Sequence, residues 1–331
     1  MGAVTVGDSR PADSGGRSEK PSATQAKPGG ENPYGALIDA CHNSPAEIQA
    51  AYATHRTTRN AQQREKFLCP EFSGLNIDTV LLRLEKPEIE PGFRDTRHCL
   101  VFWARPPNHI VKLACHLQSL LQKAAPNLWL MPPHRMHLTT LEITHSRTAQ
   151  EIADLVALMR PVIPALTGLT MQRRSRLVKP MISYDLSAVA VSFLPASGEE
   201  VVSPPSEDVA ELDGPKDSTI SGDHYTYHHL RRDAFALASE TVPINSRYVA
   251  PSAHITLGRY ITQNDHETPE QRERWVRTID DINKWLEKEV WDAKDGEFLG
   301  EWIVGQERGL EARCGTLWYG GGRTLLMGEG F

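Results

Sequence analysis

The sequence has few cysteines, no long apolar run and no excess of basic residues, and each of these shortages argues against a class of protein. The five cysteines are scattered and never form a C-x-x-C pair, which disfavours both a disulfide framework and a zinc ribbon. No window of about 18 uninterrupted apolar residues occurs, and the first residues lack an apolar signal segment. We therefore expect an intracellular protein, cytoplasmic or nuclear, without a membrane anchor.

The formal net charge of −6 comes from one segment. Residues 197–222 contain seven acidic residues and one lysine, so the remainder of the chain is close to neutral. Such a surface does not favour nonspecific binding of long polyanions, although a local cleft can still hold one phosphate end. Apolar residues make up 40% of the chain, which is enough to bury a sizeable core.

Composition divides the chain into three parts. Residues 1–33 are rich in Gly, Pro, Ser and charge, which predicts a disordered tail. Residues 34–97 are expected to form a helical extension, and residues 98–331 the main domain, in which strands and helices alternate. An acidic stretch at 196–222 has no apolar periodicity and is expected to be a disordered insertion in that domain.

The clearest helix signal lies in the extension. Ser44 and Glu47 have the spacing of a capping box, and Pro45 suits the first position of a helix. These residues predict a helix over 45–66.

Histidine followed two positions later by Ser or Thr is common in this chain, so the pattern alone says little. The histidines that show it are His42, His55, His137, His224, His254 and His266. Only His137 and His254 lie in segments typical of strands, HLTTLEI and SAHITLGRYI. Because alternate residues of a strand point to the same face, each imidazole is expected beside a hydroxyl, that of Thr139 or Thr256.

Two such couples facing each other suit the opening of a cyclic phosphodiester. In-line displacement needs a base at the attacking oxygen and an acid at the leaving oxygen. Two histidines supply both near neutral pH, and the threonine hydroxyls can hold phosphoryl oxygens. We therefore expect His137 and His254 to supply the acid and the base between them, without a metal.

The two motifs, HLT and HITL, lie 117 positions apart, and their pairing resembles the 2H phosphoesterase superfamily. More narrowly, it resembles the 2′-5′ RNA ligase and cyclic nucleotide phosphodiesterase branch found in fungi. The second motif matches the family signature fully, whereas Thr140 stands where the first motif usually has an apolar residue. The likeness covers about residues 98–320 and includes the lead-in from Tyr248 to Pro251.

The resemblance implies a bilobal α+β fold, with two pseudo-symmetric lobes whose antiparallel sheets line a central cleft and whose helices lie outside. It implies that Arg259 contacts phosphate together with Thr139 and Thr256. It also implies that the partners are RNA ends or nucleotides bearing a 2′,3′-cyclic phosphate, and that no cofactor is needed. Apart from the resemblance, the lack of a long apolar run leads us to expect no membrane binding, and we expect a monomer.

Three other interpretations stay open. The chain could be a 3′-end RNA exonuclease of the same superfamily, which would release nucleotides from a long tail. It could be a non-catalytic module that binds RNA ends or a protein. Finally, His224 and His228 stand four positions apart at the start of a predicted helix, with His229 beside them, and this spacing can bind zinc.

Overall fold

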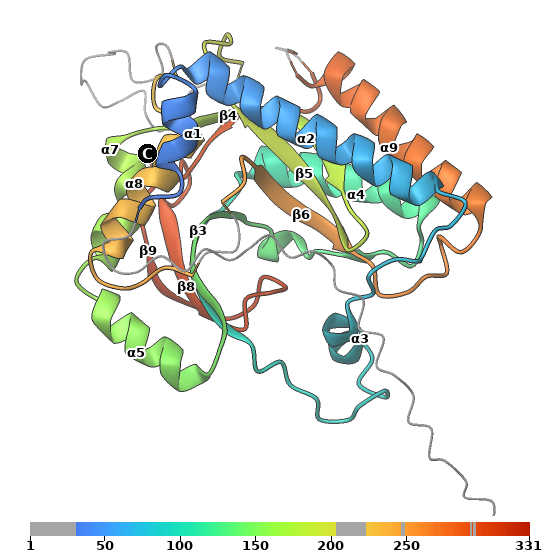
Figure 1. The fold of residues 1–331 in the computed structure, drawn as a ribbon, viewed down its shortest axis with the longest axis horizontal. Helices are drawn as coiled ribbons and strands as arrows, with labels where there is room; N and C mark the ends of the chain where they lie inside the picture. Colours follow the sequence, from blue (N-terminus) through green and yellow to red (C-terminus); the bar gives the residue numbers. More distant parts are fainter. Residues whose placement is uncertain (1–30, 203–222, 246–248, 292, 294–295) are drawn as a thin grey trace, which may run out of the picture.

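The structure, a computed structural model, places most of the main domain and the extension (Figure 1). The residues it describes are 31–202, 223–245, 249–291, 293 and 296–331. Most of the predicted N-terminal tail and acidic insertion, and Tyr248, therefore lie outside the described residues. No helix within these segments is both long enough and apolar enough to cross a membrane.

Helices and strands alternate along the main domain as the sequence predicts. The helices are α1 (Gly35–Ala40), α2 (Pro45–Leu68), α3 (Thr79–Glu85), α4 (Asn108–Ala124), η1 (Pro133–Arg135), α5 (Ala149–Met159), α6 (Ile163–Thr167), α7 (Leu169–Gln172), α8 (Tyr227–Ser239) and α9 (Pro269–Glu289). The strands are β1 (His98–Ala104), β2 (Trp129–Leu130), β3 (Leu138–Arg147), β4 (Arg176–Tyr184), β5 (Ala188–Pro195), β6 (Ala253–Arg259), β7 (Trp302–Ile303), β8 (Leu310–Gly315) and β9 (Arg323–Met327).

The strands form one antiparallel sheet in the order β7-β4-β5-β6-β3-β1-β8-β9, with β2 paired to β6. The α+β class is confirmed. The two sheets expected for two lobes are halves of this single sheet: a β4 half (β7, β4, β5, β6) and a β1 half (β3, β1, β8, β9). They are joined where β3 pairs with β6, so the two motif strands lie at the centre.

The halves of the sheet do not follow the order of the chain. The β4–β5 hairpin comes from the first half of the main domain, but it pairs with β6 from the second. Strand β8, near the C-terminus, pairs with β1. Each half of the sheet is therefore completed by strands that are distant in sequence, so neither half is built from one continuous stretch of the main domain.

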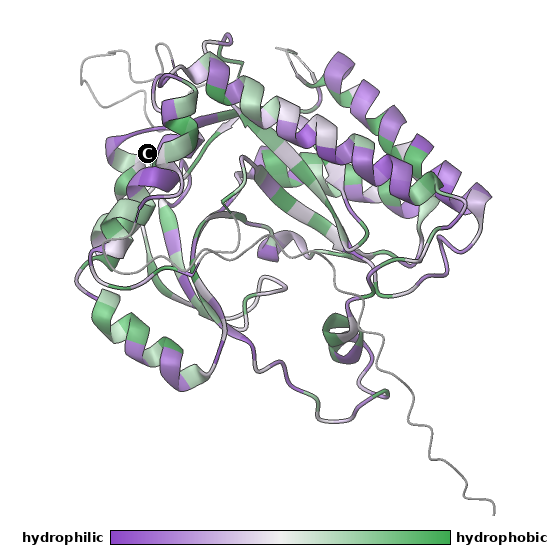
Figure 2. Cartoon of the chain, in the orientation of Figure 1, coloured by the Kyte–Doolittle hydropathy of each residue, from purple (hydrophilic) through white to green (hydrophobic). Residues whose placement is uncertain are grey.

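Each half of the sheet has its own helical cover and hydrophobic core. Helices α2, α4 and α9 lie over the β4 half, and α5 and α8 lie against the β1 half (Figure 1). Hydrophobic and hydrophilic residues alternate along α2, α5 and α9 (Figure 2), as expected for helices that bury one face. Ile255 and Leu257 belong to the larger core, whereas Phe102 and Ile143 belong to the smaller one.

Helix α2 packs directly on the sheet. It begins as predicted, with the Ser44 hydroxyl accepting a hydrogen bond from the Glu47 backbone N–H at 3.4 Å. Further along, Arg56 donates to the carbonyl of Lys179 at 2.7 Å, and the Asn60 amide donates to a carbonyl of β4 at 2.8 Å. These side chains satisfy strand carbonyls, and they fix the helix beside the β4–β5 hairpin.

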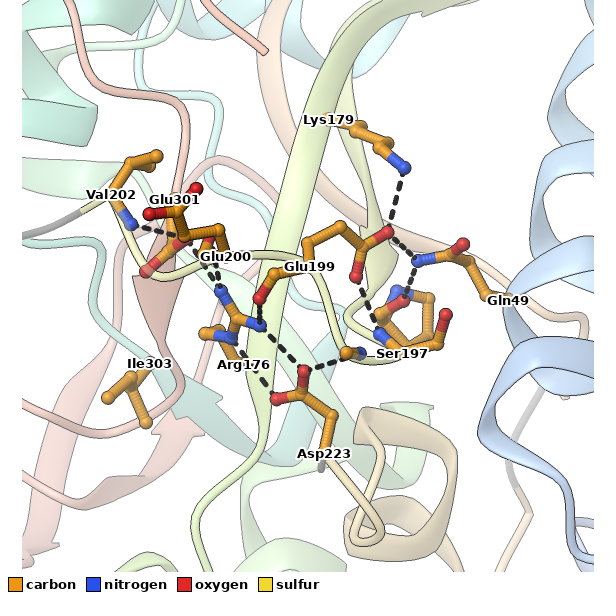
Figure 3. A network of polar contacts seen from close by, with 12 residues as sticks. Gln49, Arg176, Lys179, Ser197, Glu199, Glu200, Val202, Asp223, Glu301 and Ile303 are labelled. Atoms are coloured by element: carbon orange, nitrogen blue, oxygen red, sulfur yellow. Dashed lines mark hydrogen bonds and ion pairs between the residues drawn. The ribbon is translucent and has the colours of Figure 1, made fainter. Parts of the chain in front are cut away.

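Arg176, at the start of β4, ties together the two sides of the acidic segment (Figure 3). Its guanidinium pairs with Asp223 at 2.6 Å and with Glu301 at 2.8 Å, and all three side chains are buried. It also donates to the carbonyls of Glu199 and Glu200 at 2.5 and 3.4 Å. Residues on both sides of segment 203–222 thus bind the same guanidinium group, that of Arg176. This holds the two ends that flank the segment beside β4.

Candidate active site

The two histidine motifs meet at the centre of the sheet. Leu138 of β3 pairs with Ile255 of β6, and both of these side chains are buried in the core. In an antiparallel pair the neighbouring positions are also opposed, so His137 faces Thr256 and Thr139 faces His254. We call the face of the sheet that carries these four side chains the site face. The convergence expected from the sequence is therefore present in the fold.

His137 lies one residue before β3 and is held in a defined orientation. Its Nδ1 donates to the carbonyl of Arg135 at 2.8 Å, because a carbonyl can only accept. The proton on Nδ1 makes Nε2 the basic nitrogen of the neutral ring. The ring stacks on Trp103 of β1, with centroids 3.7 Å apart and planes at 16°. Trp103 is opposite Thr139 in the β1–β3 pair, which places His137 and Thr139 on the same face.

Cationic side chains surround the Trp103 and His137 stack. Arg105 and Arg313 both lie with their guanidinium carbons 5.2 Å from the Trp103 ring. Glu311 of β8 binds Arg105 at 2.6 Å and Arg313 at 3.0 Å, which partly offsets their charge. Burial, with a smaller contribution from the two arginines, lowers the pKa of His137 to about 3. The ring is therefore neutral at physiological pH, in the state that accepts a proton.

His254 is neutral for a similar reason. Its Nδ1 lies 3.1 Å from the hydroxyl of Ser252. Burial is the largest cause that lowers the pKa of His254 to about 4, and Arg231 and Arg259 lower it further. Asp185 acts in the opposite direction and raises the pKa, so this carboxylate would favour a proton on His254.

Arg259 reaches the site face through an irregularity in β6. In a regular strand, residues 254 and 259 would point to opposite faces. A register shift lets two residues of β6 oppose one of β5 between Thr256 and Gly258, and Arg259 ends up opposite Ala188. Arg259 then lines the same pocket as His254 and Thr256, as expected for a phosphate ligand, with Asp78 3.6 Å away.

This pocket has a volume of about 430 Å³ and lies on the β4 half of the site face. Its lining residues come from β6, from the β4–β5 hairpin and from α2; they are Arg56, Arg59, Asn60, Ser183, Tyr184, Asp185, Ser187, Ala188, Ala190, Ser252, His254, Thr256 and Arg259. The small side chains of Ala188 and Ala190 leave the space open. His137 and Thr139 lie beside it on the β1 half and do not line it.

Several residues of the site were not found from the sequence. Arg56 and Arg59 belong to the helical extension, and nothing in their local sequence connects them with strands more than a hundred residues later. Trp103 lies in a buried-strand pattern that gives no sign of a stacking role. Glu311 and Arg313 alternate with core residues of β8. For these two residues, the alternation of charged and apolar side chains is the sequence feature that could have indicated a role at the site.

Two of the three histidines considered as a zinc cluster, His228 and His229, are hydrogen-bonded within the protein. His228 contacts the hydroxyl of Tyr52 at 2.9 Å and the carbonyl of Tyr34 at 3.1 Å. His229 accepts from the backbone N–H of Thr226 at 3.1 Å and donates to Asn43 at 2.7 Å. All four ring nitrogens therefore have protein partners. Within the described segments no group of three or more His, Cys, Asp or Glu side chains is placed to hold a metal ion.

Comparisons with known proteins add little to this geometry. No protein-family model matches the chain, and no curated protein matches its sequence. Among solved structures, the crystal structure of TT0787 of Thermus thermophilus matches with 15% sequence identity and a TM-score of 0.35. The match covers 69% of this chain and 96% of that chain. At this level of similarity it assigns neither a family nor a function.

Proposed function

We propose that the protein is a two-histidine phosphoesterase of the 2H type, which opens 2′,3′-cyclic phosphates of RNA ends or nucleotides without a metal ion. One observation carries the proposal. The pairing of Leu138 with Ile255 sets His137 beside Thr256 and Thr139 beside His254 on one face of the sheet. Two imidazoles and two hydroxyls around one phosphorus atom are the groups that in-line displacement requires.

In the proposed reaction His137 is the base, His254 is the acid, and three further side chains bind the phosphoryl oxygens. Nε2 of His137 takes a proton from water, whose oxygen forms a bond to phosphorus. His254 gives a proton to the ribose oxygen as its bond to phosphorus breaks, so the product is a phosphate monoester and a free hydroxyl. Thr139, Thr256 and Arg259 donate to the phosphoryl oxygens and stabilise the charge that develops on them. The two rings then exchange protons with solvent.

His254 is neutral in the free protein. It can therefore act as the acid only if substrate binding leads to its protonation. A phosphate charge about 4 Å away contributes about 4 kcal/mol at an effective dielectric constant of about 20. That energy corresponds to about three pKa units. The interaction energy between the bound phosphate and His254 is therefore large enough to raise the pKa of His254 from about 4 towards about 7. His137 keeps its base role, because its Nδ1 proton is fixed on the Arg135 carbonyl.

This coupling predicts a difference between two pH profiles. The profile of kcat/KM follows the free enzyme, in which protonated His254 disappears as the pH rises above about 4. The profile of kcat follows the complex, in which the phosphate holds the proton. We expect the alkaline limb of kcat/KM to lie at lower pH than that of kcat, measured from pH 3.5 to 9. Coincident limbs would contradict the proposed acid.

The direct test incubates the protein with adenosine and uridine 2′,3′-cyclic phosphates in excess EDTA. We expect turnover to a monophosphate at the same rate with and without the chelator. Separating the 2′- and 3′-monophosphates would identify the bond that breaks. A complete loss of turnover in EDTA, restored by added metal, would contradict the proposal.

A binding module is the second candidate, and the low pKa values of both histidines favour it. If phosphate does not raise the pKa of His254, the site holds an RNA end without turning it over. Binding of a cyclic phosphate end without product formation, even over hours, would support this function. A 3′-end exonuclease would instead shorten a long oligonucleotide and release nucleotides one at a time.

A further inference from the structure

The 430 Å³ pocket is larger than a single cyclic phosphate needs. Sites for nucleotide-sized and drug-sized ligands commonly range from about 300 to 1,000 Å³. His254, Thr256 and Arg259 stand at the end next to the β1 half, while Arg56 and Arg59 of α2 form the far wall. The arrangement therefore offers room beyond the reaction centre, on the side where α2 crosses the hairpin.

The pocket is cationic although the whole protein is acidic. Three guanidinium groups line it, against one carboxylate, that of Asp185. Asp185 accepts from the backbone N–H groups of Ser187 and Ala188 at 2.8 and 3.0 Å, so it serves the β4–β5 turn. Its distance to Arg59 is 3.5 Å, which is long for an ion pair and leaves most of the Arg59 donors for a ligand.

Two of the guanidinium groups also have unsatisfied donors. The Nε atoms of Arg56 and Arg259 are buried and have no hydrogen-bond partner among the described residues. Arg56 is 6% exposed, and its burial lowers its pKa to about 10, so it stays charged at neutral pH. A buried donor without a partner costs free energy, which an anionic ligand oxygen would recover if the guanidinium group turned its Nε toward the pocket on binding.

The outer part of the pocket is continuous with the proposed reaction centre, because residues of both parts line one pocket. Arg59 and His254 line the same pocket, and the charge of Arg59 is one of those that lower the pKa of His254. A ligand that bridges both ends would therefore have one anionic group between the histidines and a second against α2. In a nucleoside 2′,3′-cyclic phosphate the second position corresponds to the 5′-oxygen, on the other side of the ribose.

We propose that Arg59 and Arg56 form a second phosphate subsite, which binds the 5′-phosphate of the nucleoside whose cyclic phosphate lies between the two histidines. Every 3′-terminal nucleoside of an RNA has this phosphate, whereas a free cyclic mononucleotide lacks it. The subsite would thus select RNA ends over mononucleotides. This inference rests on the proposed function for the position of the cyclic phosphate.

The test compares two probes that differ by one phosphate, adenosine 2′,3′-cyclic phosphate and its 5′-phosphorylated form, and the corresponding uridine pair. Dissociation constants are measured in full-length His137→Ala, so that the probe is not consumed. We expect the 5′-phosphate to lower Kd about tenfold or more, because a charge-assisted contact of this kind is worth at least that factor. Addition of Arg59→Gln should reduce the gain to about twofold or less.

Arg64→Gln is the matched control. Arg64 lies on the same helix, its side chain is 48% exposed against 49% for Arg59, and it also pairs with an aspartate, Asp280. This variant should keep the full gain. The inference is wrong if the 5′-phosphate gives no gain, if neither probe binds, or if the two arginine variants behave alike. Absence of hydrolysis of both probes by the unmodified protein would instead contradict the proposed function.

Discussion

Replacement of either His137 or His254 by alanine is expected to reduce kcat/KM for cyclic phosphate opening by about 10²-fold to 10⁴-fold. In the proposed reaction each variant removes one of the two proton transfers, and neither histidine would replace the other because the two would act on opposite sides of phosphorus. The rate is measured with a 2′,3′-cyclic nucleotide under subsaturating conditions. Thermal unfolding of each variant, followed by circular dichroism, establishes that the fold is retained.

His42→Ala is the control for this experiment. His42 has the same spacing to a hydroxyl residue, Ser44, but its side chain is 82% exposed and pairs with Glu47 at the start of α2. Its loss should leave turnover unchanged. Full activity in either His137→Ala or His254→Ala would show that the paired motifs do not perform the chemistry.

Arg176→Met should destabilise the fold by about 3–5 kcal/mol, the cost usual for removing one partner from a buried ion pair. The methionine fills much of the space but leaves Asp223 and Glu301 buried without their cation. Their side chains are 5% and 4% exposed, so water cannot replace the lost contacts. The free energy of unfolding is measured by urea denaturation near pH 7.

An ion pair on the protein surface serves as the control, because it separates the effect of losing a charge from the effect of burial on stability. Arg173 binds Asp233 at 3.0 Å, but the arginine side chain is 60% exposed, so Arg173→Met should cost about 1 kcal/mol or less. Addition of Glu301→Gln to Arg176→Met should recover part of the loss, because it removes one of the two carboxylate charges that Arg176 balances. Equal destabilisation by the Arg173 and Arg176 variants would show that the network adds no more than a surface ion pair.

Local sequence signals predicted the parts of the fold that depend on local physics. The Ser44 cap and Pro45 predicted the start of α2, and the strand-like pattern of SAHITLGRYI predicted β6. The common face of each His and Thr followed from the period of a strand, whereas the α+β class was expected from the resemblance of the two motifs to a known superfamily. That reasoning could not give the pairing of Leu138 with Ile255, because register between distant strands depends on packing of the whole sheet.

Long-range packing also explains what the sequence did not reveal. Arg59 becomes a pocket residue only because α2 packs on a hairpin more than a hundred residues away. Arg259 faces the site because of a register shift in β6, whereas strict alternation would have placed it on the other face. Trp103 becomes the platform for His137 through the β1–β3 pair. Each of these depends on a contact between segments whose local patterns are ordinary.

The pairing of β1 with β8 has a consequence for how the protein is made. On the ribosome, β1 emerges about two hundred residues before its outer neighbour, so its edge stays open through most of translation. A polypeptide released before Leu310 would expose that edge and lack Glu311 and Arg313, the groups beside the His137 platform. Prematurely terminated chains should therefore aggregate, and only chains that include β8 can complete the sheet beside the two histidine motifs.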